Sequence, residues 1–306
     1  MFNLIIIGGG PAGIAAGVYA ARKRLSTCLI TKEWGGQSVV STDIQNWIGT
    51  PSITGDKLAA DLKGHLMAYA EGYVSIKSGS NVNLLKKNED GSIDVTLENG
   101  DVLQTRAVLI ASGSSRRRLT IPGADTYEHK GLTYCASCDG LLFAGQDVAV
   151  IGGGNAGFET AAQLLAYAKS VTLLSHGEFK ADAITIEHVL AHPNMTAIAH
   201  AEPTEILGDR FVNGLTYKTA AGDTAKLAVG GIFIEIGMIP NTAYAKEAVH
   251  IDDYGRIEID PWTQKTSTPG IWAAGDCTNI KYHQNNIAAG DAIRALEDIY
   301  VTLKAH

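Results

Sequence analysis

The 306-residue sequence contains only four cysteines, and no part of it reaches the roughly 18 consecutive apolar residues of a membrane-spanning helix. Four cysteines are too few for the disulfide framework of a small secreted domain. The apolar residues 4–7 near the start lack the basic flank and the length of a signal peptide. We therefore expect a cytoplasmic protein without membrane partners.

Positive charge is also scarce. Lysine and arginine total 25 against 32 acidic residues, which gives a net charge of −7. Such a chain has no general attraction for phosphate backbones or anionic lipid, so nucleic acid is not an expected partner. Hydrophobic residues make up 45% and charged residues 19% of the chain, as in globular proteins, and the length suffices for two domains.

The first 30 residues have the pattern of a strand, a tight turn, a helix and a second strand. An isoleucine-rich run over residues 2–7 precedes Gly8, Gly10 and Gly13, an alanine-rich stretch follows to Arg24, and residues 27–30 are again apolar. In a dinucleotide-binding turn the first glycine makes the bend, the second admits a phosphate and the third lets helix and strand pack closely. The pattern predicts a diphosphate site at the start of the helix.

The same arrangement returns in residues 147–174. A strand over 147–151 leads into a turn with Gly152, Gly154 and Gly157, a helix to Ala168 and a strand over 171–174. Two such units predict an α/β fold class with two Rossmann-like nucleotide-binding domains.

Other segments are expected to complete these two domains. Residues 92–97 and 102–104 are expected to form a β-hairpin that covers the first sheet. Further strands are expected over 107–111, 230–236 and 270–274, with a final helix from about Ile287.

The residues after the second strand of the second unit determine which dinucleotide it can hold. NAD sites have an acidic residue there for the ribose hydroxyls, and NADP sites have arginines for the 2′-phosphate. This chain has Ser175 at that place, followed by His176, Glu178 and Lys180. Neither the acidic residue of NAD sites nor the arginines of NADP sites are present in clear form. These side chains therefore either contact a nucleotide or form a solvated turn.

Cys135 and Cys138 form the one close cysteine pair. A C-x-x-C spacing serves a redox disulfide, half a zinc site or a haem attachment. Haem attachment would need histidine after the second cysteine, where this chain has Asp139, and zinc would need a second ligand pair, whereas Cys28 and Cys277 are single. Redox chemistry remains, and no metal is expected.

In a redox pair, one thiolate attacks a partner disulfide and the other thiol resolves the mixed intermediate. Asp139 adjoins the second thiol and is a candidate for the acid that protonates a leaving thiolate. The alternative is that Asp139 is only a turn residue before Gly140.

Around the cysteine pair the sequence resembles the low-molecular-weight thioredoxin reductase family and the flavoprotein module of alkyl hydroperoxide reductase. The similarity starts from Tyr134-Cys135-Ala136-Ser137-Cys138-Asp139-Gly140 ahead of the second glycine-rich unit and extends over the whole length. It includes the 8–13 turn, residues 35–37, 44–49 and 111–113 with Arg117, the pair at 275–276 and residues 282–285. These motifs are similar to those that hold FAD in the family.

The resemblance implies two sets of binding residues. Those expected to contact FAD are Gly8, Gly10, Pro11, Ala12, Gly13, Lys32, Glu33, Gly36, Gln37, Asn46, Ala111, Gly113, Asp276, Gln284 and Asn285. Those expected at the second nucleotide-like site are Gly152, Gly154, Asn155, Ala156 and Gly157.

The resemblance also implies a discontinuous FAD-binding domain, residues 1–114 and 245–306, with an inserted NAD(P)-binding-like domain at 115–244 that carries the cysteine pair. The family reduces a thioredoxin-like protein by passing electrons from a donor through FAD to the disulfide, and it works as a homodimer. Cys135, Cys138 and Asp139 are the expected catalytic residues, with Cys138 nearer the flavin and Cys135 attacking the partner protein.

The electron donor is where this sequence departs from the family. NADPH-dependent members have an arginine cluster where Ser175 and His176 stand, and the peroxide reductase module has an acidic residue in place of Ser175. We therefore expect ferredoxin, which serves a branch of the family, rather than NAD(P)H. NADH or NADPH reduction of a thioredoxin or a peroxidase, a flavin-containing redox sensor, and a second flavin on the second glycine turn stay open as alternatives.

Two basic clusters could dock an acidic electron carrier. They lie at Arg22-Lys23-Arg24 and Arg116-Arg117-Arg118. The alternative for the first is a solvated helix end, and for the second a loop beside the adenine of FAD.

Overall fold

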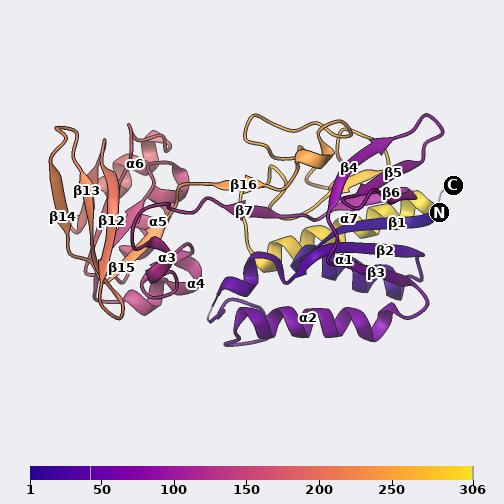
Figure 1. The fold of residues 1–306 in the computed structure, drawn as a ribbon, viewed down its shortest axis with the longest axis horizontal. Helices are drawn as coiled ribbons and strands as arrows, with labels where there is room; N and C mark the ends of the chain where they lie inside the picture. Colours follow the sequence, from indigo (N-terminus) through magenta and orange to yellow (C-terminus); the bar gives the residue numbers. More distant parts are fainter. Residues whose placement is uncertain (42, 305–306) are drawn as a thin grey trace. The chain divides into compact units, whose positions relative to one another are not determined.

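The computed structural model describes residues 1–41 and 43–304. The chain divides into two compact units, residues 1–115 with 239–306, and residues 116–238. The two connections, β7 (Ser114–Arg116) and β16 (Met238–Pro240), pair with each other as a two-stranded sheet (Figure 1). The sequence places the second boundary after residue 244, whereas the chain re-enters the first unit at Ile239, directly within β16.

The first unit is built on a seven-stranded sheet in the order β3-β2-β1-β6-β5-β4, with β17 also paired to β6. Strands β3, β2, β1, β6 and β17 are parallel, and β6-β5-β4 is an antiparallel meander. The strands are β1 (Phe2–Gly9), β2 (Thr27–Trp34), β3 (Val74–Ser78), β4 (Val82–Lys87), β5 (Ile93–Leu97), β6 (Val102–Ile110) and β17 (Ile271–Ala273).

Both faces of this sheet are buried, which explains the unbroken apolar run of β1. Leu4 and Ile6 pack with the helices α1 (Pro11–Arg22), α2 (Gly55–Ala70) and α7 (Asn285–Lys304). Ile5 and Ile7 point to the other face, where they share a core with Val95 of β5. Figure 1 shows the three helices beside β1, β2 and β3.

The expected hairpin is confirmed, because β5 and β6 pair in antiparallel register and the buried side chains of β5 cover one face of the sheet. The strand expected over residues 107–111 is not separate, since it continues β6. Long β6 can pair with β5 through its first half and with β17 through its second half.

The second unit contains a parallel sheet in the order β11-β10-β9-β15-β8 and a separate antiparallel sheet, β12-β13-β14. Its strands are β8 (Leu132–Thr133), β9 (Asp147–Ile151), β10 (Ser170–Leu174), β11 (Met195–Ile198), β12 (Glu202–Gly208), β13 (Val212–Lys218), β14 (Thr224–Leu227) and β15 (Gly231–Ile234). Its helices are α3 (Ala124–Tyr127), α4 (Ala136–Asp139), α5 (Asn155–Leu164) and α6 (Ala183–Leu190). Both units have the strand, glycine turn and helix of the predicted α/β fold.

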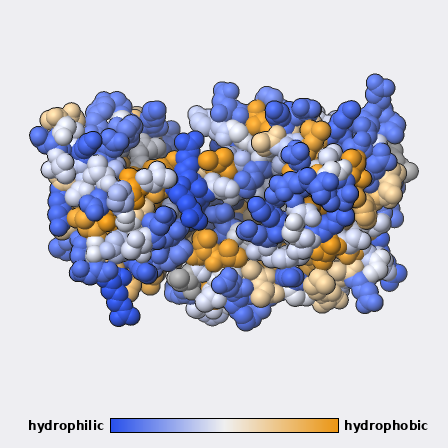
Figure 2. Space-filling model, in the orientation of Figure 1, coloured by the Kyte–Doolittle hydropathy of each residue, from blue (hydrophilic) through white to orange (hydrophobic). Residues whose placement is uncertain are grey.

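Among the described residues, no helix is long and apolar enough to span a membrane. On the face drawn in Figure 2, hydrophilic residues predominate and hydrophobic ones form small scattered groups.

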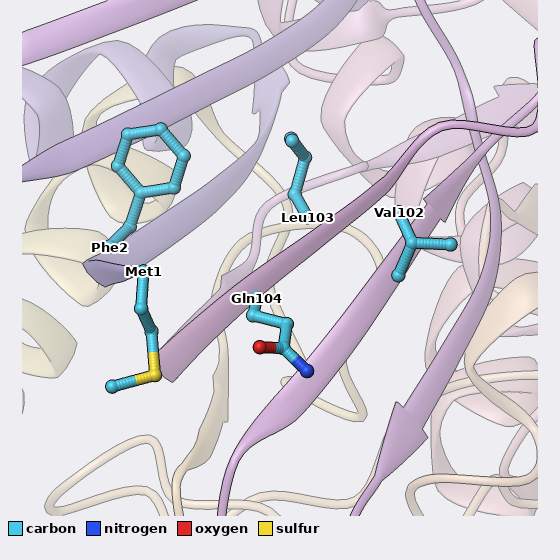
Figure 3. A pocket seen from close by; sticks show the side chains of 5 residues that line it. All are labelled: Met1, Phe2, Val102, Leu103 and Gln104. Carbon is cyan, nitrogen blue, oxygen red and sulfur yellow. The ribbon is translucent and has the colours of Figure 1, made fainter.

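A hollow of about 440 Å³ lies at the start of β1 and β6, lined by Met1, Phe2, Val102, Leu103 and Gln104 (Figure 3). The glycine turn follows the other end of β1. Because nucleotides bind at the carboxyl ends of parallel strands, this hollow is not the site that the motifs predict.

Candidate active site

The first glycine turn is packed so tightly that two of its glycines have no room for a side chain. A Cβ atom on Gly8, whose φ is +126°, would lie 2.1 Å from the carbonyl oxygen of Ala111, and one on Gly13 would lie 1.9 Å from that of Gly8. At Gly10 the nearest atom would be the Cα of Gly36, 3.7 Å away. Gly8 and Gly13 therefore hold β1, β6 and α1 together, while Gly10 keeps a surface open.

That open surface lies at the start of α1. Gly10 precedes the helix, Pro11 is its first residue, and no side chain of the described residues caps it. The first N–H groups of a helix have no partner within the helix, and together with the helix dipole they favour an anion. Gly10, Pro11, Ala12 and Gly13 thus fit the diphosphate of FAD.

The end of β2 lies beside this turn. The N–H of Gly35 donates to the carbonyl of Gly9 at 2.8 Å, which brings Gly36 opposite Gly10. Lys32 and Glu33 are exposed at the end of the strand. An acidic residue at this place binds ribose hydroxyls in dinucleotide folds, and Glu33 fits that role.

Three separate segments meet at the start of α7. Ser38 donates to Asn285 Oδ1 at 3.0 Å, and Asn46 Nδ2 donates to Gln284 Oε1 at 3.2 Å. Asn286 Nδ2 donates to the backbone carbonyl of Asn46 at 2.8 Å. Ser38 belongs to the short 3₁₀ helix Gly36–Val40, which also contains Gln37. The structure therefore gathers Gln37, Asn46, Gln284 and Asn285 in one region, with Ser38 and Asn286 as members that sequence reasoning missed.

Asp276 completes the first unit's candidate site. A Cβ on Gly275 would lie 3.5 Å from that of Ala12, so the 275–276 pair adjoins the first glycine turn. The carboxylate of Asp276 is 3.3 Å from His283 Nδ1. The sequence run 282–285 contains this histidine, but the sequence did not single it out.

Ala111 and Gly113 lie at the end of β6. The N–H of Ala111 donates to Ile7, and the carbonyl of Gly113 accepts from the N–H of Asn241 at 3.0 Å. The side chain of Asn241 also donates to the carbonyl of Ser112 at 3.0 Å. Asn241 fastens this segment and was missed because it is 128 positions from Gly113 in the chain.

The residues assigned to FAD all belong to the first unit, and the structure places them around the carboxyl ends of β1, β2, β6 and β17. They supply an open helix start for a diphosphate, an acid for a ribose and a polar cluster of amide side chains. These residues fit the flavin dinucleotide.

Cys135 and Cys138 are joined by a disulfide, with their Cα atoms 5.3 Å apart. Cys135 precedes α4, and the N–H of Cys138 lies 3.1 Å from Cys135 Sγ. Both residues are half-buried, so they are neither sealed in the core nor fully solvated. An N–H directed at a sulfur stabilises the thiolate form of that sulfur once the disulfide is reduced.

Asp139 follows Cys138 at the end of α4. Its carboxylate accepts a hydrogen bond from the hydroxyl of Thr133, the last residue of β8. Asp139 also precedes the 3₁₀ helix Gly140–Phe143. A half-buried carboxyl held in this way could serve as an acid, and its assignment stays a prediction.

The second glycine turn repeats the packing of the first. A Cβ on Gly152 would lie 2.2 Å from the carbonyl oxygen of Glu235, and one on Gly157 would lie 1.9 Å from that of Gly152. Among the described residues, no atom beyond the chain neighbours lies within 4 Å of a Cβ on Gly154. The turn is followed by Asn155 and Ala156 at the start of α5, which no side chain of the described residues caps. This turn also fits a diphosphate.

The loop after β10 is tied down on this turn. Lys180 donates its N–H to the carbonyl of Gly153 at 2.7 Å, and Asp182 donates its N–H to Asn155 Oδ1 at 2.8 Å. Ser175 is buried, and exposed Glu178 lies 2.7 Å from His200 Nε2. The loop after β10 thus carries an acidic residue three positions beyond Ser175, next to a histidine that follows β11.

Basic side chains of both clusters contact aromatic rings or acidic residues of the same chain. Arg22, Lys23 and Arg24 lie over the rings of Tyr69, Tyr300 and Tyr73, and Lys23 pairs with Glu297 at 3.0 Å. This cluster ends the 12-residue helix α1, about 18 Å along the axis from the glycine turn.

In the second cluster, Arg116 lies over the ring of Tyr134 and Arg118 lies 3.6 Å from Glu128. Docking of an acidic carrier by either cluster stays a prediction.

Glu235 is a titratable residue that the sequence interpretation left out. It follows β15, and its Oε1 accepts a hydrogen bond from Thr160 of α5 at 2.7 Å. Burial raises the pKa of this carboxyl to about 7, against the lowering effects of Thr160 and the nearby Arg116. The signal in the sequence was a single acidic residue within the apolar run 230–236.

The two kinds of glycine should respond differently to alanine. Gly13→Ala places a Cβ against a carbonyl oxygen, so we expect it to lower the free energy of unfolding by about 3 kcal/mol. Gly10→Ala meets no atom closer than 3.7 Å and should keep the fold but weaken FAD retention. Thermal unfolding and the flavin-to-protein absorbance ratio measure these effects. Equal flavin loss in two equally stable variants would contradict this assignment of the glycines.

Glu235 should make stability depend on pH. Because its pKa is about 7 in the folded chain against an ordinary value of 4.5, stability falls as pH rises from about 4.5 to 7 and stays lower above 7. The loss should approach about 3 kcal/mol. Glu235→Gln removes this titration, so over that range the unfolding free energy of wild type should fall relative to that of Glu235→Gln. A difference that does not vary from pH 4.5 to 8 would disprove the raised pKa.

Comparisons with known proteins agree with this arrangement. Residues 2–290 match the family model described as pyridine nucleotide-disulphide oxidoreductase. The chain is 37% identical over 296 residues to a Bacillus subtilis protein named NADH dehydrogenase, and 39% identical over 297 residues to a protein of Escherichia coli named as part of alkyl hydroperoxide reductase. Each alignment covers 96% of this chain and 57% of the relative, so the chain spans about half the length of these relatives.

Solved structures match over the full length. A thioredoxin reductase from Streptococcus pyogenes is 32% identical with a TM-score of 0.91, and one from Giardia duodenalis is 29% identical with a TM-score of 0.93. Each alignment covers 100% of this chain and 99% of the other. The resemblance to thioredoxin reductases and to the peroxide reductase flavoprotein is therefore confirmed. With its two Rossmann-like units and its cysteine pair, the chain is a redox enzyme that belongs to the FAD-binding pyridine nucleotide-disulphide oxidoreductase family.

Proposed function

We propose that this enzyme reduces the disulfide of a thioredoxin-like protein through Cys135 and Cys138. The observation that carries the proposal is the half-buried disulfide between these residues, with the Cys138 N–H 3.1 Å from Cys135 Sγ. The similar solved structures named thioredoxin reductases support this class of substrate. A homodimer in the cytoplasm is part of the same proposal, by analogy with the family.

FAD would be held by the residues of the first unit. The start of α1 would bind the diphosphate and Glu33 a ribose, and the cluster of Asn46, Gln284 and Asn285 would lie near the flavin. When bound, FAD supplies two-electron transfer between a donor and the disulfide.

The cysteine pair then works by thiol exchange. The thiolate of Cys135, stabilised by the Cys138 N–H, attacks one sulfur of the partner disulfide, and a partner thiolate leaves. Cys138 next attacks Cys135 Sγ, which breaks the mixed disulfide, restores the intramolecular disulfide and releases the second partner thiol. Asp139, fixed by Thr133, donates a proton to a leaving thiolate.

A pyridine nucleotide on the second glycine turn is the donor that the geometry supports best. The turn keeps Gly154 open, Gly152 and Gly157 close-packed, and the start of α5 uncapped. Glu178 is an acidic residue in the loop after β10, three positions beyond the usual place of a ribose-binding acid, and a similar Bacillus subtilis protein is named NADH dehydrogenase.

Ferredoxin stays a rival donor, because Ser175 is buried and no arginine cluster follows β10. Delivery of electrons to a peroxidase stays an alternative substrate, suggested by the relatives whose names assign them to alkyl hydroperoxide reductase. A redox sensor is the alternative outside catalysis.

Serine at either cysteine should abolish disulfide reduction and leave a yellow, folded protein. Each replacement removes one of the two sulfurs that thiol exchange requires. Ser137→Ala, at the exposed position between them, is the matched control and should keep wild-type turnover. Steady reduction of a thioredoxin measures the effect, and substantial turnover in Cys135→Ser or Cys138→Ser would refute the assignment.

The donor can be identified by anaerobic titration of the oxidised holoenzyme with NADH, NADPH and reduced ferredoxin in separate cuvettes. We expect rapid bleaching of the flavin by NADH, because Glu178 suits ribose hydroxyls better than a 2′-phosphate. Bleaching by ferredoxin alone would identify ferredoxin, and not a pyridine nucleotide, as the donor. No bleaching by any of the three, with no turnover, would favour the sensor.

A further inference from the structure

The carboxyl edge of the parallel sheet in the second unit brings four sites into one row. Along the strand order, β10 ends before Ser175, β9 before Gly152, β15 before Glu235 and β8 before Tyr134, which precedes Cys135. Strand order reverses at β9, because β10 and β11 lie on one side and β15 and β8 on the other. Ligands of such sheets bind in the crevice at this reversal, here between β9 and β15.

Glu235 lies at that reversal. Its N–H donates to the carbonyl of Ile151 at 2.8 Å, and its own carbonyl oxygen would lie 2.2 Å from a Cβ on Gly152. Its carboxyl reaches Thr160, five residues beyond the first residue of α5. Glu235 therefore contacts both the glycine turn and the helix whose start fits a diphosphate.

The direction of a bound dinucleotide follows from the same edge. The loop that carries Glu178 lies after β10, on the side where an adenosine ribose is expected. The other half of the molecule must then extend from the start of α5 toward β15, β8 and the cysteine pair. Glu235 is the acidic residue at the end of β15 on that path.

One carboxylate oxygen of Glu235 has a clear role within the fold. Thr160 donates to Oε1 at 2.7 Å, while Arg116 and Glu159 act on the carboxyl through their charges. Burial raises the pKa of this group, because removal from water disfavours its charged form. An ionisable side chain is an unusual choice there if its only task is to accept one hydrogen bond from Thr160, since a glutamine would do the same without this cost.

We propose that Glu235 is a binding residue for the nicotinamide of a pyridine nucleotide, accepting a hydrogen bond from its carboxamide N–H. This inference rests on the proposed use of the second glycine turn by a pyridine nucleotide. Thr160 acts as its positioning residue, because its hydroxyl fixes one carboxylate oxygen of Glu235. Glu235 makes no contact with the adenosine half of the ligand, which lies over β10.

The experiment compares whole nucleotides with fragments that lack nicotinamide. Oxidised holoenzyme is titrated calorimetrically with NAD⁺ and NADP⁺, and with ADP-ribose and 2′-phospho-ADP-ribose. No electron transfer takes place, so the readout is affinity alone. The variants are Glu235→Ala and Glu235→Gln, with Glu187→Ala on the exposed side of α6 as a control of equal charge change.

Glu235→Ala should weaken binding of the preferred dinucleotide about tenfold, the effect of one lost hydrogen bond, and leave its fragment unchanged. Glu235→Gln keeps an acceptor oxygen and should retain most of the affinity, and Glu187→Ala should behave as wild type. If Glu235→Ala does not fold, Glu235→Asp is the replacement, because its shorter side chain cannot reach both Thr160 and the ligand.

Two other outcomes separate this inference from the proposed function. If wild type binds a dinucleotide and Glu235→Ala binds it equally well, or loses dinucleotide and fragment alike, Glu235 is not a nicotinamide contact although the nucleotide donor stands. If wild type binds none of the four probes, the pyridine nucleotide donor and the role of Glu235 are both overturned.

Discussion

The contact on which both units depend is the closeness of a helix to the strand before it. Gly13 lies against the carbonyl of Gly8 and Gly157 against that of Gly152, each so near that a Cβ would sit 1.9 Å from the oxygen. This contact sets the first turn of α1 and of α5 directly over the carboxyl end of its sheet. The first N–H groups of each helix therefore point to the place where a dinucleotide binds, and the rest of each site is arranged around that point.

The two units have the same glycine-turn geometry but surround it with different side chains. In the first, Asn285 bonds to Ser38 of the short helix Gly36–Val40 and Gln284 bonds to Asn46, which builds a polar region that fits a flavin. In the second, the neighbouring strand ends carry a half-buried acid and a cysteine pair. Acid, glycine turn and disulfide lie at the ends of neighbouring strands of one sheet.

Local patterns predicted much of this arrangement. The glycine spacing, the isoleucine run of β1 and the hairpin of β5 and β6 were readable because each depends on neighbours in the chain. Glu235 was not, because its raised pKa comes from burial between a strand end and Thr160 of α5, 75 positions earlier. The same holds for Ser38 and Asn241, whose hydrogen-bond partners lie in distant segments.

By itself, the sequence determined the two glycine turns, the α/β class and the choice of Cys135 and Cys138 as a redox pair, because steric limits at glycine and thiol spacing are local properties. Only the tertiary structure decided that Glu178 lies beside His200, that Asn46 meets the start of α7, and that Glu235 lies at the end of β15 beside the second glycine turn. These depend on strand order in the sheets, which the pairing of distant segments decides and no single stretch of chain records.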